Sequence, residues 1–145
     1  MTWIILKGIL LSLVLGYAAY RDIKTREIPD TVPFTLLIIG FIGFSPLFSI
    51  TGLLVSGLPF LFAAFRSNGM GGGDIKLMAA CGFILGPWGG MLQTILGLAL
   101  AVLFTFLRAA ALGKKVERKL RIPLVPFLGA GGILSYLITF IGGSI

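Results

Sequence analysis

The chain has 145 residues, of which 57% are hydrophobic and only 12% charged, and it carries a net charge of +7. Because a soluble domain carries about 25% charged residues, this composition excludes an ordinary soluble protein and predicts an integral membrane protein. The absence of histidine excludes Ser-His-Asp and Cys-His catalysis and the common histidine metal sites.

Apolar runs separated by charged loops predict an all-α polytopic bundle of about six transmembrane helices. Each run is close to the roughly 20 residues that cross a bilayer. The expected spans are Thr2–Tyr20, Val32–Phe48, Ile50–Phe65, Asp74–Pro87, Gly90–Leu107 and Leu124–Ile141. The first run is followed by positive charges rather than a cleavage-type site, so we interpret it as a retained span. The third is short and is interrupted by Pro59. We expect a single membrane-embedded domain over residues 1–145.

The basic residues indicate how the bundle lies in the membrane. Eleven of the twelve Lys and Arg residues fall in three segments, 21–26, 66–76 and 108–121, and the exception is Lys7. With six spans, these three segments share one side, which the positive-inside rule makes cytoplasmic, with both termini external. We expect the lipid bilayer as a partner and no nucleic acid, because no stripe of basic and aromatic residues is present.

Few residues in this chain can do chemistry. The single cysteine, Cys81, lies in apolar sequence and is interpreted as a small packed residue. The acidic residues are Asp22, Glu27, Asp30, Asp74 and Glu117. Glu27 and Glu117 lie among basic neighbours and are interpreted as solvated. Asp30 precedes Thr31 and Pro33, which is typical of a helix N-cap.

Asp22 and Asp74 are the remaining acids, and each has two interpretations. Asp22 follows the first span, on a charged loop, and is either a plain interfacial acid or a functional one. Asp74 follows Gly71, Gly72 and Gly73, which we expect to adopt a conformation that suits only glycine. It is either an N-cap, favoured by the helix dipole, or an aspartate that a substrate backbone can approach.

Considered together, the two aspartates favour catalysis. Both are predicted at the same membrane face, and an aspartate pair is the strongest catalytic group that this composition offers. Such a pair shares one proton, because adjacent like charges do not both ionise easily. One member then activates a water that attacks a peptide carbonyl, and the other protonates the leaving nitrogen.

Three motifs carry a resemblance to a known family. "GGGD" at Gly71–Asp74 fits the GxGD signature of membrane aspartyl proteases. "DIKTREIPD" at Asp22–Asp30 and "IPLVPFLGAGG" at Ile122–Gly132 are similar to two further motifs of type IV prepilin leader peptidases, in the same order. The chain therefore resembles this family over most of its length.

The resemblance implies a peptidase in the inner (plasma) membrane of a prokaryote. It implies that Asp22 and Asp74 are the catalytic pair, and that Gly71 and Gly73 are the signature glycines. The substrate would be a prepilin or pseudopilin precursor, cut at the cytoplasmic face after a glycine, and Glu27 and Asp30 would contact its basic leader. Larger members carry paired cysteines linked to N-methylation, which this chain lacks, so we expect cleavage without methylation and without a cofactor or metal.

Other classes of protein remain as alternatives. A non-enzymatic scaffold or transporter subunit explains the spans and predicts that both aspartates are replaceable. Another GxGD protease, cutting within transmembrane helices, would place its first aspartate inside a span. An inactive relative would be expected to lack one of the aspartates, and both are present here.

Overall fold

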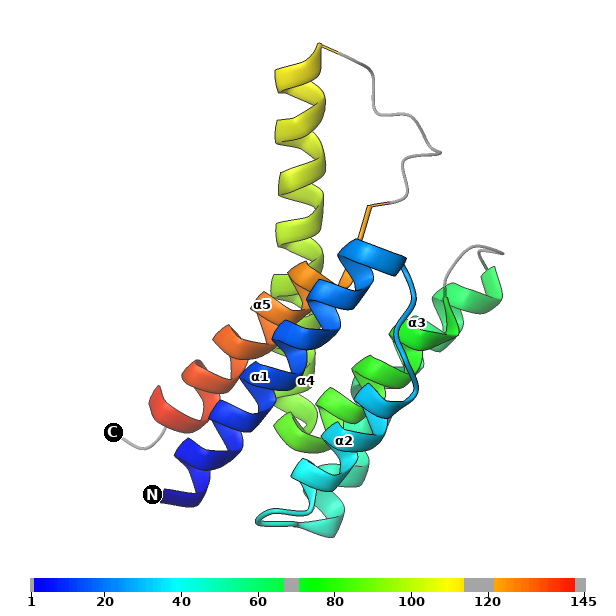
Figure 1. Ribbon diagram of the computed structural model, residues 1–145. Coiled ribbons are helices and arrows are strands. Elements are labelled where there is room, and N and C mark those ends of the chain that lie inside the picture. Colours follow the sequence, from blue (N-terminus) through cyan, green and yellow to red (C-terminus); the bar gives the residue numbers. More distant parts are fainter. Residues whose placement is uncertain (1, 67–70, 114–121, 143–145) are drawn as a thin grey trace.

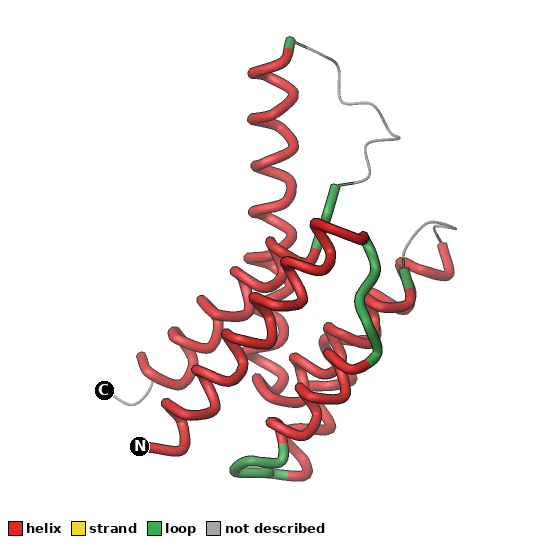
Figure 2. The backbone as a smooth tube through the Cα atoms, viewed as in Figure 1, coloured by secondary structure: helices red, strands yellow, loops and turns green. Residues whose placement is uncertain are grey.

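The computed structural model describes residues 2–66, 71–113 and 122–142, and all regular structure within them is helical. The elements are α1 (Thr2–Thr25), α2 (Thr31–Gly40), α3 (Pro46–Arg66), α4 (Gly72–Leu112), α5 (Val125–Tyr136) and a short π-helix, η1 (Leu137–Ile141). The all-α prediction is therefore confirmed for these residues. Figure 2 shows the connection between α1 and α2 and the connection between α2 and α3 as loops at opposite ends of the bundle.

The helices form one bundle, in which α1 lies beside α5 and α3 packs against α4 (Figure 1). α1 ends, and α4 and α5 begin, toward the upper end of the bundle in this view. α1 begins, and α5 ends, toward the lower end, together with the turn between α2 and α3. The segments that carry the three sequence motifs therefore converge on one end of the molecule.

α4 consists of two helical segments that meet at Gly86. This residue has φ 73° and ψ −177°, outside the helical region, and Pro87 follows it. The break separates residues 72–85 from residues 87–112, which correspond to the fourth and fifth expected spans. The chain bends there because a positive φ suits glycine and because proline cannot continue the helical hydrogen bonds of the preceding turn.

Three helices, α1, α3 and α4, are long and apolar enough to cross a membrane, whereas α2 and the α5–η1 segment are shorter apolar helices. Large apolar side chains point outward, including Phe62, Phe65 and Trp88, which are 70–79% exposed. Extended apolar surface of this kind is typical of a protein surrounded by lipid. The long apolar helices and this apolar surface fit a membrane protein, but the expected number of six membrane-spanning helices is not confirmed.

Two expected boundaries and one expected break were wrong. The second span was expected to reach Phe48, but α2 ends at Gly40, a turn follows, and α3 already begins at Pro46 rather than Ile50. The turn contains Gly43 with φ 66°, a left-handed conformation that ends helices. Pro59 does not break α3, which is continuous to Arg66. Proline is tolerated inside membrane helices because neighbouring groups satisfy the freed backbone.

The core lies where α1, α2, α4 and α5 meet. Its most buried members include Leu15, Leu36, Leu77 and Val125, each no more than 1% exposed. Cys81 belongs to the same cluster, is fully buried and is a free thiol, which confirms its interpretation as a packed residue. These four side chains come from four different helices, so their packing in one core holds the four helices together.

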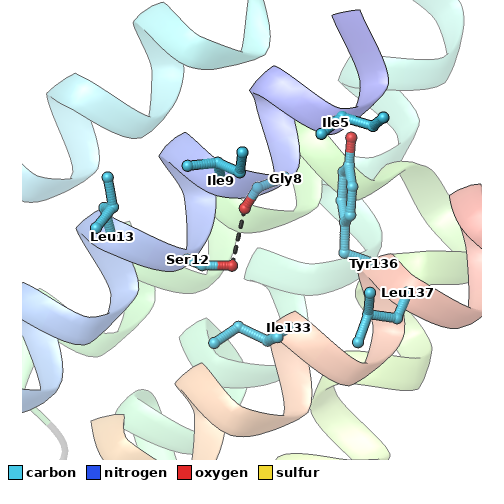
Figure 3. Close-up of a pocket in the computed structure, with 8 residues that line it drawn as sticks. All are labelled: Ile5, Gly8, Ile9, Ser12, Leu13, Ile133, Tyr136 and Leu137. Carbon is cyan, nitrogen blue, oxygen red and sulfur yellow. Dashed lines mark hydrogen bonds between the residues drawn. The ribbon is translucent and has the colours of Figure 1, made fainter. Parts of the chain in front are cut away.

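The contact between α1 and α5 involves a close approach of an aromatic ring to a glycine. A Cβ atom on Gly8 would lie 2.6 Å from the Tyr136 ring. The Tyr136 hydroxyl donates a hydrogen bond to the Ile4 carbonyl at 2.6 Å. Figure 3 shows Tyr136 and Ser12 at a cavity of about 370 Å³ between these helices, where the Ser12 hydroxyl donates to the Gly8 carbonyl.

Lys7, the basic residue outside the three charged segments, has a structural role at the lower end. Its Nζ donates a hydrogen bond to the Ile42 carbonyl at 2.9 Å, just beyond the end of α2. Cations near a helix C-terminus satisfy free carbonyls and complement the helix dipole. This contact explains a charge that the positive-inside rule alone does not.

The Lys7→Met variant is expected to lose about 1 kcal/mol of stability, because the Ile42 carbonyl loses a charged donor. The measurement is thermal unfolding in detergent micelles. Lys24→Met is the matched control, since Lys24 is exposed and contacts only its own helix, through a 3.4 Å hydrogen bond to the Tyr20 hydroxyl and a position over the Tyr20 ring, among the described residues. Equal stability losses in the two variants would contradict this role of Lys7.

Candidate active site

Asp22 lies inside α1 rather than on the loop that the sequence predicted. α1 continues to Thr25 and ends where Arg26 adopts φ 54°, with the Arg26 N–H donating to the Asp22 carbonyl at 2.9 Å. Asp22 is only 7% exposed. Helix α1 carries the chain past the last apolar residue expected, Tyr20, so the polar residues that follow belong to its last turn. Because Asp22 lies inside a helix, its position does not distinguish this protein from other GxGD proteases, whose first aspartate is expected inside a span.

The Asp22 carboxylate is held by the beginning of α5. Its Oδ2 accepts a hydrogen bond from the backbone N–H of Val125 at 3.0 Å, in a buried contact between residues 103 positions apart. A carboxylate at a helix N-terminus meets both a free donor and the positive end of the helix dipole. The third sequence motif, residues 122–132, thus contributes directly to the surroundings of Asp22.

Asp74 lies in the first turn of α4, but it is not the N-cap, which was one of its two interpretations from the sequence. The N-cap is Gly71, and the Asp74 N–H donates to the Gly71 carbonyl at 3.1 Å. The helix begins earlier because Gly72 and Gly73 are themselves helical. The half-buried Asp74 carboxylate still lies near the positive end of the helix dipole, which favours negative charge.

The fold brings Asp22 and Asp74 close enough to interact electrostatically. No hydrogen bond joins the two carboxylates within the described part of the chain. They therefore form an open pair, with one buried member on α1 and one half-buried member on α4. Two carboxylates so placed disfavour simultaneous ionisation, which is the condition for sharing a proton.

The glycines before Asp74 act through space rather than through an unusual conformation. Gly71 has φ −67°, and neither Gly72 nor Gly73 has a positive φ, so the expected glycine-only conformation was wrong. A Cβ atom on Gly73 would lie 3.1 Å from the Cβ of Ile28, whereas Gly71 and Gly72 face open space. Gly73 therefore lets the connection between α1 and α2 pack onto the start of α4.

The Gly73→Ala variant is expected to reduce activity about tenfold, because its methyl group pushes Ile28 away and shifts the two aspartate-bearing segments apart. Gly72→Ala is a matched control in the same helical turn, with nothing within 4 Å of its Cβ position, and should remain near wild type. The measurement is the turnover number of each variant. An equal loss in both variants would contradict the steric role of Gly73.

Asp30 does not cap α2 with its side chain, contrary to expectation. Its backbone is already helical, with φ −60° and ψ −17°, and its carboxylate makes no cap hydrogen bond. Instead, Asp30 Oδ1 forms an ion pair with Lys76 Nζ at 2.7 Å. This pair links the end of the α1–α2 connection to α4, two residues after Asp74. It is largely exposed, so its contribution to stability is only about 0.2–1 kcal/mol.

Glu27 lies on the same connection and is exposed. Its backbone carbonyl accepts a hydrogen bond from the Thr25 hydroxyl at 3.4 Å. No hydrogen bond or ion pair within the described residues joins its carboxylate to Asp22 or Asp74. The structure therefore brings Asp22, Asp74, Gly73 and Asp30 to one end of the bundle and leaves the Glu27 side chain in solvent.

Residues 9–113 match the type IV leader peptidase family. This match covers more than half of the chain and includes both aspartates. The chain belongs to this family. As a leader peptidase family member it combines the GxGD segment with the Asp22 motif, as the resemblance in the sequence implied.

Two curated relatives are similar to the matched region, and both are named prepilin leader peptidase/N-methyltransferase. The one from Bacillus subtilis (strain 168) is 38% identical over 90 residues, which cover 59% of this chain and 36% of the relative. The one from Neisseria gonorrhoeae is 36% identical over 97 residues, covering 59% and 34%. The matched region of this chain therefore corresponds to about a third of the length of each relative. No solved structure matches it significantly.

Three residues of this candidate site were not found by sequence reasoning. Ile28 and Lys76 contact the opposite motif through side chains, and Val125 contributes only its backbone N–H. Lys76 was detectable in principle, as the basic residue nearest to Asp74. The Val125 N–H was not detectable in this way, because every residue except proline has a backbone N–H. The only local sign in the sequence is the pair of nearby prolines, Pro123 and Pro126.

A groove of about 360 Å³ begins beside the ion pair and runs between α2, α3 and α4. It is lined at one end by Asp30 and Lys76 and further along by apolar residues that include Phe34, Leu37 and Leu53. Among the described residues, no group of three or more His, Cys, Asp or Glu side chains is placed to hold a metal ion.

Proposed function

We propose that this chain is a membrane aspartic endopeptidase that removes the basic leader from prepilin-like precursors. Membership of the type IV leader peptidase family supports the class of substrate. The observation that carries the aspartic mechanism is the convergence of Asp22 and Asp74 on one end of the bundle, within electrostatic reach of each other. The names of both relatives agree with a prepilin substrate.

The proposed reaction is hydrolysis of one peptide bond. With one proton shared between the two carboxylates, the ionised carboxylate takes a proton from a water molecule as that water attacks the carbonyl carbon. The protonated carboxylic acid donates a hydrogen bond to the carbonyl oxygen. The C–N bond then breaks as a proton passes to the leaving nitrogen. The titration belongs to the pair, so neither role is assigned to a single residue.

The open pair suggests that substrate completes the site. Catalytic geometry often tightens only when substrate binds, and Asp74 lies in the first turn of its helix, three residues after Gly71. Open space at Gly71 supports an approach of the substrate backbone to Asp74. We propose that an extended peptide passes over Gly71 and reaches both carboxylates.

We propose that the site faces the cytoplasm of a prokaryotic cell from the plasma membrane. The motif-bearing end of the bundle carries Arg21, Lys24 and Lys76, and basic residues favour the cytoplasmic side. α1 begins and α5 ends at the opposite end, which would place both termini outside. In this arrangement the shorter helices α2 and α5 complete a bundle of about six membrane segments.

We propose that Asp30 and Glu27 contact the positively charged leader. Both are exposed acids beside the groove or on the connection that leads to it. Substrate cations would compete with Lys76 for the Asp30 carboxylate, which is accessible because its side chain is 80% exposed. Cleavage is proposed after a glycine, as in the family that the sequence resembles.

The direct test uses the full chain in liposomes with candidate prepilins, with identification of the new N-terminus by mass spectrometry. The expected product begins at the residue after the glycine that ends the leader. We expect an unmethylated terminus, since the aspartate pair provides hydrolysis only. Failure to cleave any prepilin, with protein shown to be folded, would contradict the proposed function; a methylated product from this chain alone would contradict only the expected lack of methylation.

The Asp30→Asn variant is expected to retain most of the wild-type activity. The ion pair with Lys76 is exposed and contributes little to stability, so its loss leaves Asp22 and Asp74 in place. Any effect should appear as a few-fold increase in KM for substrates with a basic leader, and should be absent for a substrate whose leader charges are neutralised. A large fall in kcat would show that Asp30 has a role in the chemical step.

A further inference from the structure

The start of α5 reaches the candidate active site through a single backbone group. The Val125 N–H donates to Asp22 Oδ2 at 3.0 Å, in a buried position. We propose that this N–H is a positioning group that orients the Asp22 carboxylate for the reaction. The inference rests on the proposed function, because it concerns the same aspartate pair.

The first turn of α5 has one N–H available for this purpose. Helix starts leave their first four N–H groups without partners inside the helix. Here Pro126 has none, and the N–H groups of Phe127 and Leu128 both donate to the Leu124 carbonyl at 3.1 Å. The remaining donor is that of Val125, and it is the one that Asp22 accepts. The Pro126 ring thus removes the nearest alternative donor.

Packing fixes this donor in position. The Val125 side chain is fully buried in the core cluster that includes Leu15 and Ala18 of α1 and Leu77 of α4. One turn later, the Leu128 carbonyl accepts a hydrogen bond from the buried Gln93 amide at 3.1 Å. The N–H of Val125 is therefore set by the same core that sets the two helices carrying Asp22 and Asp74.

Holding one carboxylate oxygen restricts rotation of the Asp22 side chain. Because Oδ2 accepts from the Val125 N–H, Oδ1 is the oxygen that we propose takes part in the reaction. Pre-oriented groups of this kind lower the barrier of the chemical step without adding to substrate affinity. The expected signature of losing the N–H is a fall in kcat with little change in KM.

The test replaces Val125 by its α-hydroxy acid during cell-free synthesis of the full chain, which converts one amide to an ester and removes the N–H while keeping the side chain. Val32 is the matched control, because it also lies in the first turn of a helix and its N–H donates to the Pro29 carbonyl at 3.0 Å. Each ester also weakens the preceding carbonyl as a hydrogen-bond acceptor. Because this side effect is common to both variants, the difference between their kcat values reports the loss of the contact with Asp22.

The ester at Val125 is expected to lower kcat about tenfold, with KM within twofold of wild type and the Val32 ester near wild type. The infrared band of the Asp22 carboxylate, assigned with Asp22→Asn, should shift in the Val125 ester only; this reading does not depend on cleavage. Unchanged kcat and an unchanged band in an active enzyme would overturn this inference alone. Wild-type protein that cleaves no prepilin would overturn the proposed function instead.

Thermal unfolding of both esters checks that the fold is kept. If the Val125 ester alone unfolds, Val125→Pro removes the same N–H with a residue that suits the first helical turn, and the same readings apply. Unfolding of both Val125 variants, with the Val32 ester stable, would overturn the inference, because the N–H would then serve the fold rather than the orientation of Asp22.

Discussion

The Asp22→Asn and Asp74→Asn variants are each expected to lose at least about a thousandfold in the rate of prepilin cleavage. Asparagine keeps the size and shape of aspartate but neither takes up nor donates the shared proton. Each change therefore removes the pair as an acid–base unit, whichever residue holds the proton. The measurement is single-turnover cleavage in liposomes, where the chemical step is separated from product release.

These losses should occur without loss of the fold. In Asp22→Asn, the amide oxygen can still accept the Val125 N–H, and Asp74 is only half-buried. Thermal unfolding near that of wild type is therefore expected for both variants. Asp30→Asn is the control and should remain active. Asp30 lies at the same end of the bundle and pairs with Lys76. Wild-type cleavage by either catalytic variant would show that the residue is not catalytic.

The Gly86→Ala variant is expected to lose about 3 kcal/mol of stability. Gly86 has φ 73°, which strains any residue with a Cβ atom, and a Cβ atom there would overlap the Phe48 ring. The two effects add because the Phe48 ring, carried by α3, also packs edge-on against the Phe140 ring, which limits its movement away from Gly86. The measurement is thermal unfolding of the purified protein in detergent.

Gly113→Ala separates the two contributions. Gly113 also has a left-handed conformation, with φ 59°, but nothing lies within 4 Å of its Cβ position. Only the strain of about 1 kcal/mol is expected there. If both variants lost equal stability, the contact with Phe48 would have no part in fixing the bend of α4.

The sequence predicted the helical segments better than their ends. Each expected span corresponds to a helical segment, and the division of α4 at Gly86 lies between the fourth and fifth. Hydropathy identifies apolar runs, but polar residues can extend a helix beyond its apolar part, as Asp22 does in α1. The opposite error occurred in α2, where apolar residues after Gly40 form a turn. The backbone conformation of the residues at a helix terminus decides where the helix ends, and hydropathy contains no information on that conformation.

The sequence was enough to select the two aspartates of the candidate site, but not the residues that contact them or their segments. Asp22 and Asp74 followed from the lack of other reactive residues and from the spacing of charged segments. The Asp30–Lys76 ion pair, the contact of Gly73 with Ile28 and the Val125 N–H depend on tertiary packing. Asp30 illustrates the limit, because its position before a helix predicted a cap, whereas a lysine 46 residues away takes its carboxylate.

The measurement that tests the central claim most directly is a double-mutant cycle on the two aspartates. Single-turnover cleavage of one prepilin is compared for wild type, Asp22→Asn, Asp74→Asn and the double variant. If the carboxylates act as one unit, the double variant is no slower than the slower single variant, because either change alone already removes the pair. Losses that multiply in the double variant, or a single variant that cleaves as fast as wild type, would contradict a catalytic aspartate pair.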